Sequence, residues 1–186
     1  MIRKFDAPAL IDAVKKAHSI LIGTHINPDG DAIGSSLAVG HALRAMGKEI
    51  TFACADPVPG KLQFLPGADA FVQPEALEGK AFDLAFAVDA ADEGRLGSVA
   101  DAFFQVPFSV QVDHHPTNPC YANVNAVDGR AAAAGCVVYR LLVEMGCEIT
   151  PEIAQCLYAG ISTDTGNFSF QNTDGEAFAI VAELVR

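Results

Sequence analysis

Short apolar runs alternate with longer segments of helical periodicity along most of this chain, and this alternation restricts its fold more than any other feature. The runs 19–24, 49–54, 82–88 and 108–112 have the length and continuous apolar character of buried strands. Segments with helical periodicity occur at 33–46, 130–145, 151–161 and 174–185. Such alternation predicts an α/β fold, in which a mostly parallel sheet carries helices on both faces.

Residues that begin or end helices support these boundaries. Gly47 and Gly146 stand where helix C-caps belong. Thr150 followed by Pro151 is typical of an N-cap with proline at the first helical position. Segment 55–80 is rich in turn residues, and we expect a surface connection with one short helix there. A chain of 186 residues suffices for one well-buried domain and is too short for two ordinary ones.

The composition excludes several classes of protein. With 51% hydrophobic and 19% charged residues, the chain does not resemble a disordered protein. No apolar stretch approaches the ~20 residues of a membrane span, and the first residues lack the apolar core of a signal peptide. The cysteines form no Cys-x-x-Cys pair and stand at positions 54, 120, 136, 147 and 156. We therefore predict a cytoplasmic protein, without membrane contact, whose thiols form neither disulfides nor a zinc site.

The net charge of −11 restricts the partners of the protein. Proteins that hold a long duplex do so with Lys and Arg, and this chain has only 12 such residues. A long duplex is therefore excluded as a partner. A small anionic ligand stays possible if bound metal supplies the positive charge.

Acidic and histidine residues follow the ends of apolar elements at four places. They are the run His25-x-x-x-Asp29-x-Asp31, the lone Asp89, the run Asp113-His114-His115, and Asp164. The first three follow predicted strands, whose carboxyl ends lie along one edge of a parallel sheet, so we expect them to converge. The five carboxylates would repel one another unless divalent cations bind. Oxygen and imidazole ligands without thiolate favour Mn²⁺, with Mg²⁺, Co²⁺ or Zn²⁺ as alternatives.

Each cluster also has an ordinary structural interpretation. Pro28-Asp29-Gly30 is a common turn sequence, and Asp31 would serve as an N-cap for the following helix. Asp89 could open a loop, and Asp164 could be a turn residue. Only the coincidence of all four clusters favours a site. His18 and His41 lack such acidic neighbours, and we expect both on the surface and not among the ligands.

From about Ser19 to its C-terminus the sequence resembles the DHH phosphoesterase superfamily. It matches, in order, the motif His-x-x-x-Asp-x-Asp, a lone Asp, Asp-His-His, and a final Asp in the context Thr163-Asp-Thr-Gly. It is most similar to the bacterial nanoRNases, which degrade short oligoribonucleotides and remove the 3′-phosphate of 3′-phosphoadenosine 5′-phosphate. Family II pyrophosphatases share the metal scheme but usually carry Thr at the position of Gly30.

The resemblance implies a Rossmann-like domain that holds two Mn²⁺ ions, or Mg²⁺ or Co²⁺ in their place. The first ion would be bound by His25, Asp29 and Asp89. The second would be bound by Asp31, Asp89, His114 and Asp164, so that Asp89 bridges the pair. His115 and Asp113 would be catalytic, with His115 facing the scissile phosphate and Asp113 orienting it. A hydroxide activated by both metals would attack phosphorus.

Substrate contacts are predicted outside this set. Ser35 and Ser36 would lie in the first turn of the helix after Asp31, where free backbone N–H groups could bind an anion. They are equally well read as ordinary polar residues at a helix start. Arg95 follows Asp89 closely and could reach a substrate phosphate.

The resemblance thus implies a metal-dependent phosphoesterase acting on short oligoribonucleotides, on 3′-phosphoadenosine 5′-phosphate, or on both. We expect 1–186 to form the DHH catalytic domain, without the DHH-associated C-terminal domain of family members. A pyrophosphatase, a cyclic-dinucleotide phosphodiesterase and a non-catalytic nucleotide-binding module remain as alternatives. A homodimer is possible. The stretch 131–135 also departs from the family pattern, because it lacks the Ser or Thr often found near that helix start.

Overall fold

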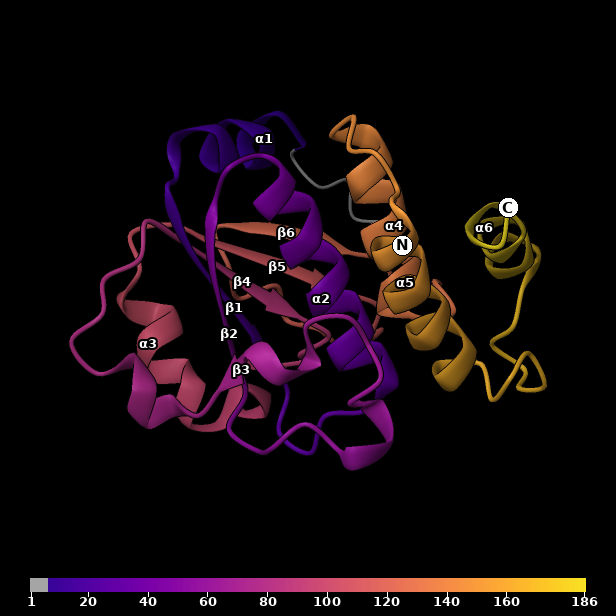
Figure 1. Ribbon diagram of the computed structural model, residues 1–186, viewed down its shortest axis with the longest axis horizontal. Helices are drawn as coiled ribbons and strands as arrows, with labels where there is room; N and C mark the ends of the chain where they lie inside the picture. Colours follow the sequence, from indigo (N-terminus) through magenta and orange to yellow (C-terminus); the bar gives the residue numbers. More distant parts are fainter. Residues whose placement is uncertain (1–6) are drawn as a thin grey trace.

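The computed structural model of the protein describes residues 7–186 (Figure 1). Its strands pair in parallel throughout and form one sheet in the order β3-β2-β1-β4-β5-β6. The strands are β1 (Ser19–Thr24), β2 (Glu49–Ala53), β3 (Phe71–Val72), β4 (Leu84–Val88), β5 (Ser109–Asp113) and β6 (Val124–Val127). The predicted parallel sheet is confirmed. The edge strands β3 and β6 lie outside the predicted runs because they are too short to show a periodicity of their own.

Helices cover both faces of the sheet, as predicted, but unequally. The larger apolar core joins one face to five helices, namely α1 (Ala7–Lys16), α2 (Gly30–Ala45), α4 (Ala134–Glu144), α5 (Pro151–Asp164) and α6 (Gly175–Leu184). In Figure 1, α2, α4 and α5 lie side by side, and α6 lies outside them. The smaller core joins the other face to the 3-10 helix η4 (Glu93–Val99) and to α3 (Ala100–Gln105).

The structure corrects three predicted helix boundaries. Helix α2 begins at Gly30 instead of 33, because the Asp29 side chain accepts hydrogen bonds from the backbone N–H groups of Asp31 and Ala32. Asp29, and not Asp31, is therefore the N-cap. Helix α4 begins at Ala134 instead of 130, after an extended residue at Ala133. Helix α5 continues past 161 to Asp164, which places that carboxylate on the last helical turn.

Segment 55–80 also differs from the prediction of one short helix. It contains β3 and three short 3-10 helices, η1 (Gly60–Leu62), η2 (Ala68–Ala70) and η3 (Pro74–Leu77). Prolines at 57, 59, 66 and 74 interrupt the backbone hydrogen bonds that a longer α-helix needs. The surface connection is thus a series of single turns.

Glycines allow α2 and α5 to pack closely. A Cβ added at Gly34 would lie 2.3 Å from the Cys156 carbonyl oxygen, and one at Gly30 would overlap the Thr163 side chain. We predict that Gly34→Ala lowers the free energy of unfolding by about 2 kcal/mol or more, since a backbone oxygen cannot move aside. Chemical denaturation would measure this loss. Gly175→Ala is the matched control, because a Cβ there meets nothing within 4 Å. Equal stability of the two variants would contradict the prediction.

The thiols differ in how deeply they are buried. Cys54, Cys136 and Cys156 are buried, and Cys120 and Cys147 are partly exposed. Among the described residues, the helices lack the length and apolar character needed to cross a membrane. The predicted lack of a signal-peptide core concerns the N-terminus, of which residues 1–6 lie outside the described part.

Candidate metal centre

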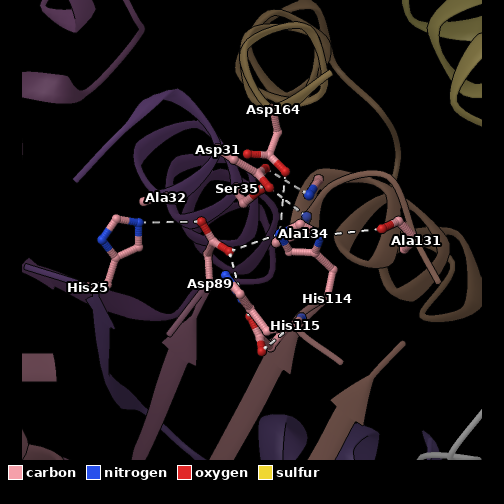
Figure 2. A network of polar contacts seen from close by, with 12 residues as sticks. His25, Asp31, Ala32, Ser35, Asp89, His114, His115, Ala131, Ala134 and Asp164 are labelled. Atoms are coloured by element: carbon pink, nitrogen blue, oxygen red, sulfur yellow. Dashed lines mark hydrogen bonds and ion pairs between the residues drawn. The ribbon is translucent and has the colours of Figure 1, made fainter. Parts of the chain in front are cut away.

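The candidate site lies where the strand order reverses. The chain runs outward from β1 to β2 and β3, then returns to β4 beside β1 and continues outward to β5 and β6. Ligands of such sheets bind at the carboxyl ends of the strands that flank this reversal. His25 directly follows β1, Asp89 directly follows β4, and His114 directly follows β5. The predicted convergence of the first three clusters is confirmed, and one chain supplies all of these residues (Figure 2).

The first group of candidate ligands consists of His25, Asp29 and Asp89. The His25 Nε2 atom lies 3.8 Å from Asp29 Oδ1 and 3.6 Å from Asp89 Oδ2. On the other side of the ring, Nδ1 lies 2.7 Å from the Ile26 carbonyl oxygen. In the neutral ring, a proton on Nδ1 would donate to this carbonyl, and the Nε2 lone pair would be free to bind a metal ion between the carboxylates.

The second group consists of Asp31, His114 and Asp164, and it contacts Asp89 from the opposite side. His114 Nε2 lies 3.4 Å from Asp164 Oδ2 and 3.6 Å from Asp89 Oδ1. His114 Nδ1 lies 3.2 Å from the Ala131 carbonyl oxygen, which favours the same tautomer as in His25. Within each group the candidate ligand atoms lie within 4.8 Å of one another. Figure 2 shows Asp89 between the rings of His25 and His114.

Asp31 lies in the first turn of α2, and its fully buried side chain contacts the start of α4. Its carboxylate accepts hydrogen bonds from the backbone N–H groups of Ala134 (2.5 Å) and Gly135 (2.9 Å) and from Ser35 Oγ (2.8 Å). These contacts replace the missing side-chain cap of α4, since the N-cap residue Ala133 makes none. The positive end of the α4 dipole also stabilises the charged form of Asp31.

Ser35 and Ser36 do not lie in the first helical turn, where the sequence analysis placed them as possible substrate contacts. Because α2 begins at Gly30, both serines lie beyond its first turn, and both are fully buried. The Ser35 hydroxyl donates to Asp31, so its observed role is to orient a candidate ligand. The Ser36 hydroxyl has no hydrogen-bond partner among the described residues.

We predict that Ser35→Ala weakens metal binding while the fold is retained. Loss of one hydrogen bond to a buried carboxylate lowers Mn²⁺ affinity about tenfold, the lower end of the effect of residues behind a metal ligand. Isothermal titration calorimetry would measure the change. Ser98→Ala, at an exposed position in η4, is the control. An affinity equal to that of the parent protein would show that Ser35 does not orient Asp31.

Asp113 holds His115 in one orientation. Asp113 Oδ1 lies 2.8 Å from His115 Nδ1, and Oδ2 accepts the His115 backbone N–H at 3.2 Å and the Asn118 Nδ2 at 2.5 Å. The His115 side chain is 40% exposed, whereas Asp113 is fully buried. His115 Nδ1 also lies 3.8 Å from Asp89 Oδ1, but its hydrogen bond to Asp113 occupies that nitrogen. His115 is therefore better placed to face a substrate than to bind a metal.

Burial and the crowding of carboxylates control the ionisation of this centre. Burial and the neighbouring charge of Asp31 raise the pKa of Asp89 to about 7 and that of Asp164 to about 6. Burial disfavours the charged forms of His25 and Asp29, but their mutual ion pair and further polar contacts outweigh that effect. The pKa of His25 is thereby raised to about 10, and that of Asp29 is lowered to about 2.

These pKa shifts predict how the stability of the metal-free protein depends on pH. The folded pKa of Asp89 exceeds its ordinary value of 3.8, so its ionisation costs stability as pH rises from 4 through about 7. The contribution of His25 is complete below 6.5 and is lost as pH rises through about 10. The melting temperature should therefore fall between pH 5 and pH 9, and Mn²⁺ should reduce that fall. A melting temperature that is constant or rises over this range would contradict the raised pKa values of Asp89 and His25.

The remaining predicted residues have clear positions. Arg95 Nη2 lies 3.0 Å from His25 Nδ1, on the far side of that ring from the carboxylates, and the Arg95 carbonyl accepts the Ile26 N–H. Its predicted contact with substrate stays a prediction. His18 is exposed, as predicted. His41 is only partly exposed, and its Nε2 lies 2.8 Å from the Pro66 carbonyl oxygen. Sequence reasoning missed Asn118, because the turn Pro-Thr-Asn-Pro carries no sign that its amide reaches Asp113.

A family model described as "DHH family, N-terminal domain" matches residues 19–161. The chain belongs to the DHH family. Over 186 aligned residues it is 41% identical to the bifunctional oligoribonuclease and PAP phosphatase NrnA of Thermus thermophilus, covering 98% of this chain and 55% of that protein. It is 30% identical to the Bacillus subtilis protein of the same name, covering 95% and 56%. It is 28% identical to a probable manganese-dependent inorganic pyrophosphatase of Streptococcus mutans, covering 90% and 54%.

Solved structures agree with this family fold. An exopolyphosphatase-related protein from Bacteroides fragilis matches with a TM-score of 0.91 and 25% identity, over 100% of this chain and 58% of that one. RecJ of Thermus thermophilus, solved with Mn²⁺, matches with a TM-score of 0.53 and 17% identity, over 100% and 27%, which shows the fold alone. The DHH chain described here spans about half the length of the curated relatives it matches.

Proposed function

We propose that this DHH chain is the catalytic domain of a metal-dependent phosphoesterase. It would hydrolyse phosphate esters of short oligoribonucleotides, of 3′-phosphoadenosine 5′-phosphate, or of both. The observation that carries the proposal is the position of Asp89 between two groups of candidate ligands. Its Oδ1 atom is buried and has no hydrogen-bond partner among the described residues. Leaving such an atom unsatisfied is costly, and a cation bound beside it would remove that cost.

The donor set fits a pair of divalent cations. His25, Asp29 and Asp89 would hold one, and Asp31, Asp89, His114 and Asp164 would hold the other. Paired cations of this kind lower the pKa of a bound water and neutralise charge on phosphoryl oxygens. The donors are carboxylate oxygens and imidazole nitrogens, which suits Mn²⁺ and admits Mg²⁺ or Co²⁺. The manganese-dependent pyrophosphatase named above is a relative that supports Mn²⁺.

Asp113 and His115 act together on the substrate phosphate. The hydrogen bond to Asp113 raises the pKa of His115, so the ring is more often protonated at neutral pH. With Nδ1 held by Asp113, the free Nε2–H of this half-exposed ring donates to a phosphoryl oxygen and stabilises the charge that develops there. Asp113 accepts the Nδ1 proton and keeps the ring from turning, so the second proton of the protonated ring lies on the outward Nε2.

The identity of the substrate is proposed from the relatives. The two relatives at 41% and 30% identity are both named for oligoribonuclease and PAP phosphatase activity. The four candidate ligand carboxylates carry −4, which two divalent cations would balance. A short anionic substrate could then bind despite the overall charge of −11. We also place the protein in the cytoplasm, in keeping with the free thiols of Cys54, Cys136, Cys147 and Cys156.

The test is a substrate panel measured with Mn²⁺. RNA dinucleotides, 3′-phosphoadenosine 5′-phosphate, pyrophosphate and cyclic dinucleotides would be compared, with the Asp89→Asn protein as control for contaminating enzymes. We expect turnover of the first two and none in the control. Hydrolysis of pyrophosphate alone, or of cyclic dinucleotides alone, would overturn the proposal. Mn²⁺ binding without turnover of any compound would instead indicate a non-catalytic binding module.

A further inference from the structure

Asp89, which lies between the two groups of candidate ligands, has an unusual backbone conformation. Its φ angle is +56°, in the left-handed region that residues other than glycine adopt infrequently. Such conformations persist when the surrounding structure holds them, and they gather at functional sites. The contacts that fix this turn therefore control where the Asp89 carboxylate points.

The peptide group before Asp89 is held by both neighbouring strands. The Asp89 N–H donates to the Val112 carbonyl of β5 at 2.9 Å. The Val88 carbonyl, at the other end of the same peptide group, accepts the Thr24 hydroxyl of β1 at 2.8 Å. The entry into the left-handed turn is thus fixed on two sides.

The exit from the turn is held by two side chains that the proposed chemistry does not use. The Ala90 carbonyl accepts Gln111 Nε2 at 3.0 Å and the Tyr121 hydroxyl at 3.0 Å. Gln111 is fully buried in β5 and lies two residues before Asp113. The Tyr121 ring packs edge-on against Phe103 of the smaller core, with 6.0 Å between the ring centres. Both donors therefore have packed side chains with little freedom to move.

Gln111 is a costly residue at this position. Its Oε1 atom is buried and has no hydrogen-bond partner among the described residues. An apolar side chain would avoid that cost, so the benefit of Gln111 lies in its Nε2 contact with the Ala90 carbonyl. That contact stabilises the segment that carries Asp89.

We propose that Gln111 and Tyr121 are positioning residues that hold the Asp89 carboxylate between the two metal ions. The inference rests on the proposed function, because it takes Asp89 to be the shared ligand. Neither side chain touches the candidate ligand atoms; both act through the Ala90 carbonyl. Removing either donor frees the left-handed turn, and the carboxylate no longer stays aligned with both ligand groups.

Tyr121→Phe tests this proposal, because it removes the hydroxyl and keeps the ring. Tyr158→Phe is the matched control, since Tyr158 lies on α5 and packs against Phe168. Calorimetry would give the number of Mn²⁺ ions bound and their affinities, and electron paramagnetic resonance would report the magnetic coupling between the two ions. We expect Tyr121→Phe to bind the weaker ion about tenfold less tightly and to lose coupling, as for other residues behind a metal ligand. Gln111→Met, which keeps the side-chain volume, should behave likewise.

The outcomes separate this inference from the proposed function. If the parent protein binds fewer than two ions, the two-metal proposal fails first. If the parent protein binds two coupled ions and both variants retain its affinity and coupling, only the positioning role is overturned. Melting temperatures of the metal-free proteins complete the test. A loss of affinity that merely follows a loss of folded protein would also overturn the positioning role.

Discussion

Replacement of Asp89 with Asn is expected to lower the proposed phosphoesterase activity by on the order of 10³-fold or more, because both proposed metal ions would lose a charged ligand at once. Asn keeps the size of the side chain and removes the negative charge that lies between the two groups of candidate ligands. Metal analysis after dialysis against Mn²⁺ should show fewer than two ions per chain. Asp69→Asn is the control, because Asp69 is an exposed carboxylate in η2.

The same variant carries a second, opposite effect on stability. Asp89 is buried beside Asp31, and its ionisation is unfavourable in the metal-free protein. The metal-free Asp89→Asn protein should therefore melt at a higher temperature than the parent protein at pH 8. If the variant keeps two ions and full activity, Asp89 is not the shared ligand. If the variant melts at a lower temperature than the parent protein, repulsion between the Asp89 and Asp31 carboxylates does not destabilise the metal-free protein.

Replacement of His115 with Gln is expected to reduce kcat by about 10²- to 10³-fold while Mn²⁺ content stays unchanged. The reason is that Asp113 engages His115 Nδ1, so that in the proposed function the ring contacts the substrate through its exposed edge and does not bind a metal ion. Steady-state kinetics and metal analysis on the same preparation would measure both quantities. His18→Gln, at an exposed histidine far along the strand direction from the site, is the control.

A second variant tests the orienting role of Asp113. Asp113→Asn keeps the side-chain size but removes the charge that raises the pKa of His115. The upper limb of the pH–rate profile should then move to lower pH, with kcat reduced less than by His115→Gln. If His115→Gln loses a metal ion instead, His115 belongs among the metal ligands. The proposed roles, with His114 binding a metal ion and His115 contacting the substrate, would then be wrong.

The sequence was sufficient to predict the layers of the fold because their signals are local. Four apolar runs are long enough to identify β1, β2, β4 and β5, and the carboxyl ends of parallel strands must share one edge. That rule alone brings His25, Asp89 and His114 together from distant parts of the chain. The clusters of candidate ligands could therefore be located from the sequence.

The contacts that orient these residues could not be predicted, because they depend on packing between distant elements. Asp29 looked like a turn residue and Asp31 like an N-cap, yet Asp29 caps α2 and Asp31 accepts N–H groups at the start of α4. The error of three residues at the start of α2 also misplaced Ser35. Gln111 gave no signal at all, since its role depends on where the Ala90 carbonyl lies in the folded chain.

The proposed pair of metal ions can be located by anomalous diffraction at the manganese absorption edge, from crystals of this chain grown with Mn²⁺. If two ions bind as proposed, two strong peaks should lie on either side of Asp89. One should lie within bonding distance of His25 Nε2 and Asp29, and the other within bonding distance of Asp31, His114 Nε2 and Asp164. A single peak, or a peak bonded to His115 and not shared through Asp89, would contradict the proposed pair.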